Sequence, residues 1–389
     1  MSNQQTFLEA LEERGVSRRS FMKFCAITAS SLALAGTHAR LFAAALASAP
    51  KPTVIWLSFQ QCTGCSESIL RSFGPALSVE NLILNVISLD YHETLQVAAG
   101  DQAEKCRKDA MQAAHGSYVL IIDGSIPAND KEFWACIAGN SALAHLQEAV
   151  NGAGLVIALG TCAAFGGVPA ALPNPSNAYG YTDLLVDTKL VVNPKMEHKN
   201  LIEVPMVPGS NPPKPVPFVN ISGCPPMATV ITSTIALYLT KVKDLLDGKI
   251  TIDDLLKVLD RYNATTNPMG ILDYLYRPKP FYGDRGDPVV HTDCPRFPHW
   301  EKQEFAKSYG DEGARQGYCL LNLGCRGPQA RNSCTRLGWN TDPNDGGLFK
   351  NSPTHAGHNC LGCSEPNFWD TGFDVGRERF RQGFYSVQK

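Results

Sequence analysis

The chain has 389 residues, among them 33 Gly, 26 Pro and 13 Cys, and its formal net charge is −2. This length favours two domains, and a hydrophobic fraction of 44% is enough for a sizeable core. The sequence has no cluster of Lys and Arg that would bind phosphates, which argues against a nucleic-acid partner. No apolar run reaches the roughly 18 residues that span a bilayer.

Residues 1–47 have the pattern of an export signal. Ser17–Lys23 reads S-R-R-S-F-M-K and matches the twin-arginine pattern S-R-R-x-F-x-K, and Ala45–Ala47 supplies an A-x-A cleavage site. The alternative is a short amphipathic helix with a chance Arg pair. Twin-arginine signals export proteins that are already folded. We therefore expect a periplasmic protein whose thiols are occupied by cofactors before export, so that its cysteines need not imply disulfides.

Residues 48–265 alternate between short apolar runs and helix-like stretches. Buried strands separated by helices predict a parallel α/β sheet. The predicted strands are Thr53–Phe59, Tyr118–Ile122, Leu155–Leu159 and Pro217–Ile221. The predicted helices are Cys65–Ser72, Ala98–Ala114, Lys131–Ala138, Ala142–Asn151 and Thr229–Asp247.

Residues 266–389 differ in character, because Pro, Gly, Asp and Asn become frequent and hydrophobic periodicity is lost. Such a region is poorly held by a hydrophobic core, and we expect bound metal clusters to hold it together. Two further stretches, 172–217 and 339–353, are predicted to be loops or insertions.

Four cysteines follow three of the predicted strands. Cys62 and Cys65 follow the first strand, Cys162 the third and Cys224 the fourth. The carboxyl ends of parallel strands meet at one edge of a sheet, so these thiols are expected to converge there. The neighbouring glycines allow backbone N–H groups to approach bound sulfur, which favours an iron–sulfur cluster. Structural zinc, or buried cysteines without metal, remains an alternative.

A second group of seven candidate ligands lies in the irregular region. It comprises His291, Cys294, Cys319, Cys325, Cys334, Cys360 and Cys363. One tetrahedral zinc site would use only four of them, and disulfides would leave His291 unexplained. Two clusters fit best, one with four ligands and one with three, but the spacing does not group the ligands.

The cysteine motifs, taken together and in this order, resemble those of the small subunit of nickel–iron hydrogenases from about Lys51 to the C-terminus. The motifs are C-T-G-C-S-E at Cys62–Glu67, G-T-C-A at Gly160–Ala163, G-C-P-P at Gly223–Pro226, H-x2-C at His291–Cys294 and C-L-G-C-S-E-P at Cys360–Pro366. The resemblance implies a flavodoxin-like sheet domain followed by a mostly irregular iron–sulfur cluster domain.

The resemblance also implies three ligand sets and no catalytic residue in this chain. A proximal [4Fe–4S] cluster is expected on Cys62, Cys65, Cys162 and Cys224. A distal [4Fe–4S] cluster is expected on His291, Cys294, Cys319 and Cys325. A medial [3Fe–4S] cluster is expected on Cys334, Cys360 and Cys363, with Pro353 where a further cysteine would allow a fourth iron.

The expected function is electron transfer in a hydrogenase heterodimer. The chain lacks the R-x-C-G-x-C and D-P-C-x-x-C motifs of the large subunit, so the nickel–iron centre is assigned to that partner alone. A cytochrome or another external acceptor would take the electrons, and attachment to a membrane through a partner is left open. Two other readings are a quinone-linked iron–sulfur subunit of a respiratory complex and an exported binding module held together by zinc or disulfides.

Overall fold

The computed structural model describes residues 51–72, 87–129, 134–185, 201–208, 213–246, 248–261, 263, 265–267, 270–283, 290–339, 351–366 and 368–369. The predicted export signal at residues 1–47 lies outside these ranges, as does most of the predicted insertion at 339–353. None of the helices in the described ranges has the length and apolar character needed to cross a membrane.

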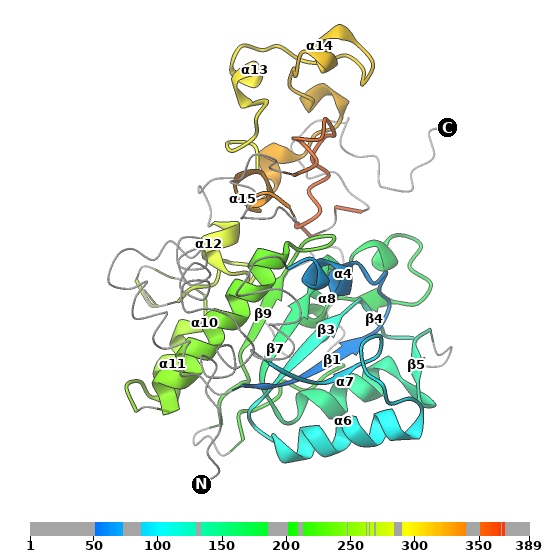
Figure 1. Ribbon diagram of the computed structural model, residues 1–389, viewed down its shortest axis with the longest axis vertical. Helices are drawn as coiled ribbons and strands as arrows, with labels where there is room; N and C mark the ends of the chain where they lie inside the picture. Colours follow the sequence, from blue (N-terminus) through cyan, green and yellow to red (C-terminus); the bar gives the residue numbers. More distant parts are fainter. Residues whose placement is uncertain are drawn as a thin grey trace, which may run out of the picture.

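A five-stranded parallel sheet forms the centre of the first region (Figure 1). Its strands lie in the order β2-β1-β3-β7-β9, which is the 2-1-3-4-5 order of flavodoxin-like folds. They are β1 (Thr53–Ser58), β2 (Ser88–His92), β3 (Tyr118–Asp123), β7 (Ala153–Leu159) and β9 (Phe218–Ile221). Every neighbouring pair is parallel, which confirms the predicted fold class.

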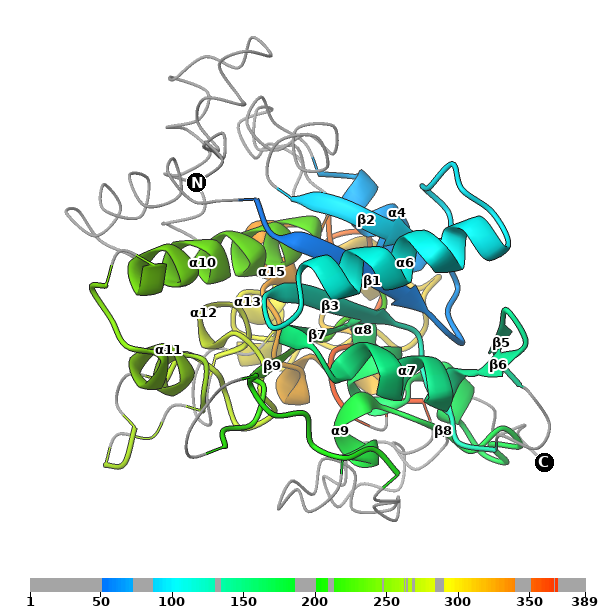
Figure 2. The ribbon, with the colours of Figure 1, turned by 90° about the horizontal axis from the view of Figure 1, so that it is seen from below.

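Alternating side chains of the strands enter two separate cores. Val54 and Trp56 of β1 pack on the face covered by α4 (Gly64–Leu70), α10 (Ala228–Leu246) and α11 (Ile252–Val258). Ile55 and Leu57 pack on the opposite face with α6 (Asp101–Ala113), α7 (Ala142–Val150) and α8 (Gly160–Phe165). Figure 2 shows the sheet between α10 on one side and α7 on the other. This burial on both faces explains the continuous apolar runs of the strands.

The structure differs from the predicted elements at several places, and the stretch 172–217, predicted to be a loop or insertion, contains a short strand at 178–179 and a helical turn at 181–184. Strand β2 was not predicted, because S-L-D-Y-H is polar and the strand lies at the edge of the sheet. The helix predicted at Lys131–Ala138 is wrong within the described residues. There, β5 (Cys136–Ile137) and β6 (Asn140–Ser141) form a hairpin. Ala138 and Gly139 connect them with φ of 50° and 78°, the backbone that a tight two-residue hairpin turn requires.

Short elements complete the first region. Strands β4 (Ile126–Pro127) and β8 (Ala178–Tyr179) pair antiparallel, and β8 is followed by α9 (Tyr181–Leu184). Residues 270–283 contain α12 (Lys279–Tyr282) and contribute Leu272, Phe281 and Tyr282 to the core shared with α10. The predicted boundary between residues 265 and 266 stays a prediction.

The second region lies beyond the carboxyl edge of the sheet, above α4 and α8 (Figure 1). Its helices are single turns: α13 (Phe297–Glu301), α14 (Glu312–Arg315) and α15 (Cys334–Leu337). Short 3-10 turns at 321–323 and 327–329 connect them. Its hydrophobic cluster has only six buried members among the described residues, and two of these are Cys325 and Cys360. Since thiols form part of so small a core, whatever binds the thiols will also stabilise this region.

Candidate functional site

The first four candidate ligands lie at the carboxyl edge of the sheet. Cys62 lies between β1 and α4, Cys65 in the first turn of α4, Cys162 in α8 directly after β7, and Cys224 after β9. Burial raises the pKa of the Cys162 thiol to about 12, and the negative charges of Cys62 and Asp123 add to this. Burial also raises the pKa of Cys224 to about 12, with contributions from the thiolates of Cys162 and Cys62. The four thiols are therefore neighbours.

Two glycines lie against these sulfur atoms. Gly160 has φ of 86°, and a Cβ added there would lie 2.5 Å from Sγ of Cys65. Gly167 has φ of 59°, and an added Cβ would overlap Sγ of Cys162. Both positions combine a left-handed backbone with close approach to a thiol, so glycine is required for two reasons. The backbone therefore lies directly against both thiols, and neither position has room for a side chain.

Asp123 is a member of this site that the sequence analysis missed. It is the last residue of β3, it is buried, and its Oδ2 atom has no hydrogen-bond partner in the described part of the chain. Burial raises the pKa of its carboxyl to about 6. The strand-end rule that selected the cysteines could have found it, because β3 ends at the same edge.

His291, Cys294, Cys319 and Cys325 form the second set of neighbours. Burial raises the pKa of Cys319, with contributions from the Cys325 and Cys294 thiolates. Backbone N–H groups of Arg296 and Gly327 lie 3.4 Å from Sγ of Cys294 and 3.5 Å from Sγ of Cys325. Such N–H···S contacts stabilise a negatively charged sulfur.

His291 has the environment of an unused ligand. Its Nε2 atom is buried and has no hydrogen-bond partner among the described residues. Its ring packs edge-on against Phe297 and Trp300, with centroids 5.0 and 4.8 Å away. Burial lowers the pKa of the ring, which favours the neutral form that can bind a metal. An orphaned nitrogen beside three thiols fits the bound cluster that the resemblance implies.

Cys334, Cys360 and Cys363 form the third set, between the other two. Burial raises the pKa of the Cys360 thiol well above its usual value, and the thiolates of Cys325, Cys363 and Cys334 contribute. The N–H of Cys360 also lies 3.4 Å from Sγ of Cys325. At the other end, the thiolate of Cys363 contributes to the raised pKa of Cys224. The third set therefore contacts the second and lies within electrostatic range of the first.

Hydrogen bonds connect the first and third sets. The Thr161 hydroxyl donates to the carbonyl of Cys363 and accepts from the N–H of Gly223 at 2.9 Å. The Ser222 hydroxyl donates to the carbonyl of Ser364 at 2.7 Å. The last cysteine loop of the chain is thus bonded to two turns of the sheet edge, each next to a cysteine.

A buried ion network supports the same loop. Arg277 is fully buried, and its Nε donates to Asp273 at 2.8 Å. Its Nη1 donates to Glu365 at 2.8 Å and to the carbonyl of Ser364 at 3.1 Å. Glu365 Oε1 also accepts the backbone N–H of Arg331 at 2.7 Å. Sequence analysis missed this network, which fixes the residues that directly follow Cys363.

Two cysteines of the described ranges, Cys106 and Cys136, lie outside the three ligand sets. The cysteines of the described ranges are all free thiols, and Cys106 and Cys136 are exposed on α6 and β5. In the described ranges, no three Cys, His, Asp or Glu side chains come close enough together to hold one metal ion.

Comparison with known proteins identifies the family. Residues 287–374 match the family model for the C-terminal part of the NiFe/NiFeSe hydrogenase small subunit, and residues 62–238 match that of the NADH ubiquinone oxidoreductase 20 Kd subunit. The chain is 36% identical over 372 residues to the uptake hydrogenase small subunit of Azotobacter vinelandii, covering 96% of this chain and 86% of that one. The chain belongs to the nickel–iron hydrogenase small subunits.

Other comparisons agree with this assignment to the small subunits. The periplasmic [NiFe] hydrogenase small subunit 1 of Nitratidesulfovibrio vulgaris is 38% identical to this chain over 362 residues. The alignment covers 93% of this chain and 93% of that one. The structure of [NiFeSe] hydrogenase from Desulfovibrio vulgaris Hildenborough superposes with a TM-score of 0.62 at 29% identity, covering 86% of this chain and 98% of that one. Small subunits of this family carry iron–sulfur clusters, and this one is a subunit of a hydrogenase.

Proposed function

We propose that this small subunit relays electrons between the nickel–iron centre of a large subunit and an external acceptor through three clusters. The observation that carries the proposal is the unbroken series of ligand sets. Hydrogen bonds from Thr161 to the carbonyl of Cys363 and from Ser222 to the carbonyl of Ser364 join the first set to the third. The N–H of Cys360, which lies 3.4 Å from Sγ of Cys325, joins the third to the second. A series of neighbouring sites is what stepwise electron transfer over a long distance needs.

The proposed ligand sets are those expected from the resemblance. Cys62, Cys65, Cys162 and Cys224 would hold the proximal [4Fe–4S] cluster, and His291, Cys294, Cys319 and Cys325 the distal one. Cys334, Cys360 and Cys363 would hold the medial [3Fe–4S] cluster. When bound, these groups supply reversible one-electron chemistry. The protein contributes sulfur and imidazole ligands, N–H donors and burial.

Both ends of the series reach the surface. Cys62 is exposed at one end, and Trp300, which packs on His291, is 38% exposed at the other. We therefore propose that the Cys62 end lies against the large subunit and that the acceptor, a cytochrome or similar carrier, meets the His291 end. The periplasmic names of relatives and the S-R-R-S-F-M-K segment support a periplasmic location reached by the twin-arginine route.

The experiment uses the complex purified without oxygen. We expect a brown heterodimer with nickel in the large subunit and iron with labile sulfide in this chain. Electron paramagnetic resonance of the oxidised complex should show a three-iron signal. Cys334→Ser should remove that signal, whereas Cys136→Ser, which changes an exposed cysteine, should leave it intact.

Two results would overturn the proposal. One is a colourless or zinc-containing chain in an active complex. The other is a three-iron signal of full intensity in Cys334→Ser, which would show that the third set does not hold that cluster.

A further inference from the structure

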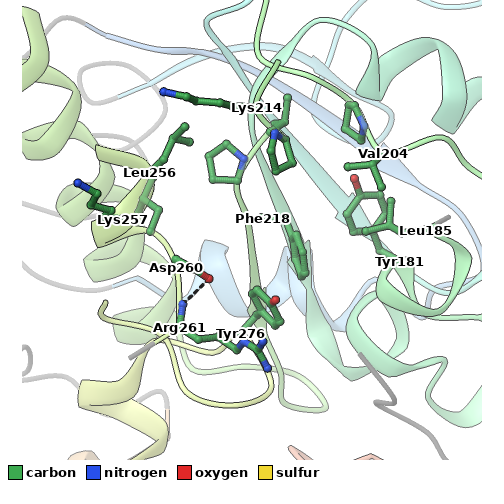
Figure 3. Close-up of a pocket in the computed structure, with 15 residues that line it drawn as sticks. Tyr181, Leu185, Val204, Lys214, Phe218, Leu256, Lys257, Asp260, Arg261 and Tyr276 are labelled. Carbon is green, nitrogen blue, oxygen red and sulfur yellow. Dashed lines mark hydrogen bonds between the residues drawn. The ribbon is translucent and has the colours of Figure 1, made fainter. Parts of the chain in front are cut away.

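A pocket of about 550 Å³ lies far from the cysteine turns, at the opposite edge of the sheet (Figure 3). Phe218, the first residue of β9, lines it, whereas Cys224 follows the last residue of that strand. Its walls come from Tyr181 and Leu185 at α9, residues 204–205 and 214–217, the end of α11 with residues 259–261, and Tyr276. Its volume lies in the range of small-molecule sites, roughly 300–1,000 Å³.

Three aromatic rings form one wall of this pocket. Phe218 stacks on Tyr276 with centroids 4.5 Å apart, and Tyr181 meets the edge of Phe218 at 5.8 Å. Aliphatic side chains such as Leu185, Val216 and Leu256 make up most of the remaining surface. Such a lining would accept a flat apolar body.

A buried hydroxyl faces into this apolar space. Tyr181 is only 1% exposed, and burial raises the pKa of its hydroxyl. Figure 3 shows the hydroxyl directed toward the pocket. A polar group on a bound molecule could exchange a hydrogen bond with this hydroxyl, which would offset the cost of burying both groups.

Tyr276 is held in a strained conformation. Its φ is 59°, which is rare for a bulky side chain, and its carbonyl accepts the N–H of Asn220 of β9 at 2.9 Å. The turn that contains it is fixed by Asp273 and Arg277. A positive φ at a bulky residue persists only where surrounding contacts impose it, and such residues are concentrated at functional sites.

The cations at the mouth of the pocket differ in their partners. Lys214 pairs with Asp253, and Lys257 lies 3.9 Å from Asp254. Arg261 instead lies over the ring of Tyr276 at 5.0 Å, and no ion pair to its guanidinium is found in the described ranges.

The acidic group in the pocket lining is Asp260, whose carboxylate accepts the backbone N–H of Arg261 at 2.7 Å (Figure 3). Arg261 can therefore offer its planar set of donors to a carboxylate from outside the chain.

We propose that this pocket binds a small aromatic carboxylate. The aromatic body would lie against Phe218 and Tyr276, the carboxylate at Arg261, and a hydroxyl or amide at the far end would bond to the Tyr181 hydroxyl. The proposal does not depend on the assignment of the clusters.

The test uses the intact heterodimer and the probe 3-(4-hydroxyphenyl)propionate, with binding measured by calorimetry. Two analogues separate the contacts: the carboxamide lacks the charge, and 3-phenylpropionate lacks the hydroxyl. We expect saturable binding of the probe, with affinity reduced about tenfold for the carboxamide and severalfold for 3-phenylpropionate.

Matched variants assign these losses to residues. Arg261→Gln should lower the affinity for the carboxylate probe about tenfold and leave the affinity for the carboxamide unchanged. Tyr181→Phe should lower the affinity for the hydroxyl-bearing probe but not for 3-phenylpropionate. Lys105→Gln, on the exposed face of α6, is the control and should change nothing. Unchanged hydrogen oxidation shows that the variants are folded. Absence of saturable binding, or equal binding by wild type and Arg261→Gln, would overturn the proposal.

Discussion

Replacing Arg277 by Met should destabilise the subunit more than any surface change. The side chain is fully buried and bonds to both Asp273 and Glu365, which are themselves 0% and 2% exposed at the side chain. Methionine has a similar length but carries no charge, so the substitution leaves two buried carboxylates without their cation. The carbonyl of Ser364 loses the donor that Arg277 supplies and keeps the Ser222 hydroxyl.

The expected cost follows from this burial. Removing one partner of a buried ion pair costs about 3–5 kcal/mol, because the remaining charge stays desolvated. For a domain of this size such a loss lowers the melting temperature by roughly 10 °C. Arg277→Lys keeps the charge but not the planar arrangement of donors, so its melting temperature should lie between those of wild type and Arg277→Met.

The loss should also depend on pH. Burial raises the pKa of Asp273, and Arg277 opposes that shift, so removing Arg277 raises the pKa further. A carboxyl whose pKa is higher in the folded state than in the unfolded state stabilises only in its protonated form. The penalty in Arg277→Met therefore grows as the pH rises above about 4, the ordinary value for Asp. The variant should be closer to wild type at pH 5 than at pH 8.

The assay follows the loss of visible absorbance of the complex on heating without oxygen. The intensity of the three-iron signal is measured before heating, to show how much cluster each variant contains at the start. Since unfolding of such a complex is irreversible, wild type and variants are heated at one fixed rate. Lys105→Met breaks an exposed pair with Asp109 on α6 and serves as the control. A shift for Arg277→Met no larger than that of the control, at pH 8, would refute the reasoning.

Three further changes test other parts of the chain. Gly160→Ala places a methyl group against the sulfur of Cys65 and should abolish the proximal signal in resonance spectra; a normal signal would contradict the predicted ligand. Pro353→Cys should convert the medial cluster to a four-iron form of lower potential, seen as loss of the three-iron signal, and persistence of that signal would place the open corner elsewhere. Arg18→Lys combined with Arg19→Lys should retain the folded protein in the cytoplasm, and normal periplasmic accumulation in cell fractions would disprove the export route.

The sequence predicted the parallel sheet, and the grouping of the first four cysteines at its edge, for a physical reason. Strands buried on both faces must be continuous apolar runs, and turns at their carboxyl ends converge whatever the intervening helices do. Strand β2 escaped prediction because an edge strand tolerates the polar residues of S-L-D-Y-H. The hairpin at Cys136–Ser141 is short enough for its two-residue turn to be mistaken for part of a helix.

Contacts between distant parts of the chain could not be predicted. Arg277 and Glu365 are 88 positions apart, and no periodicity or motif connects them. The same holds for Thr161 and Cys363, which are 202 positions apart. The pocket beside Phe218 also depends on segments that approach one another only in the folded chain. Local sequence patterns indicate ligands and strands, whereas the supports around them emerge from tertiary packing.

The bond between Thr161 and Cys363 has a consequence for the order of events during biosynthesis. The turn next to Cys224 reaches its final form only with Thr161 in place, and Thr161 is held by a loop near the C-terminus. The hydrogen bond that joins this edge of the sheet to the last cysteine loop can therefore form only after residue 363 has left the ribosome. Until then the turns that carry Cys162 and Cys224 lack a contact that they have in the folded chain.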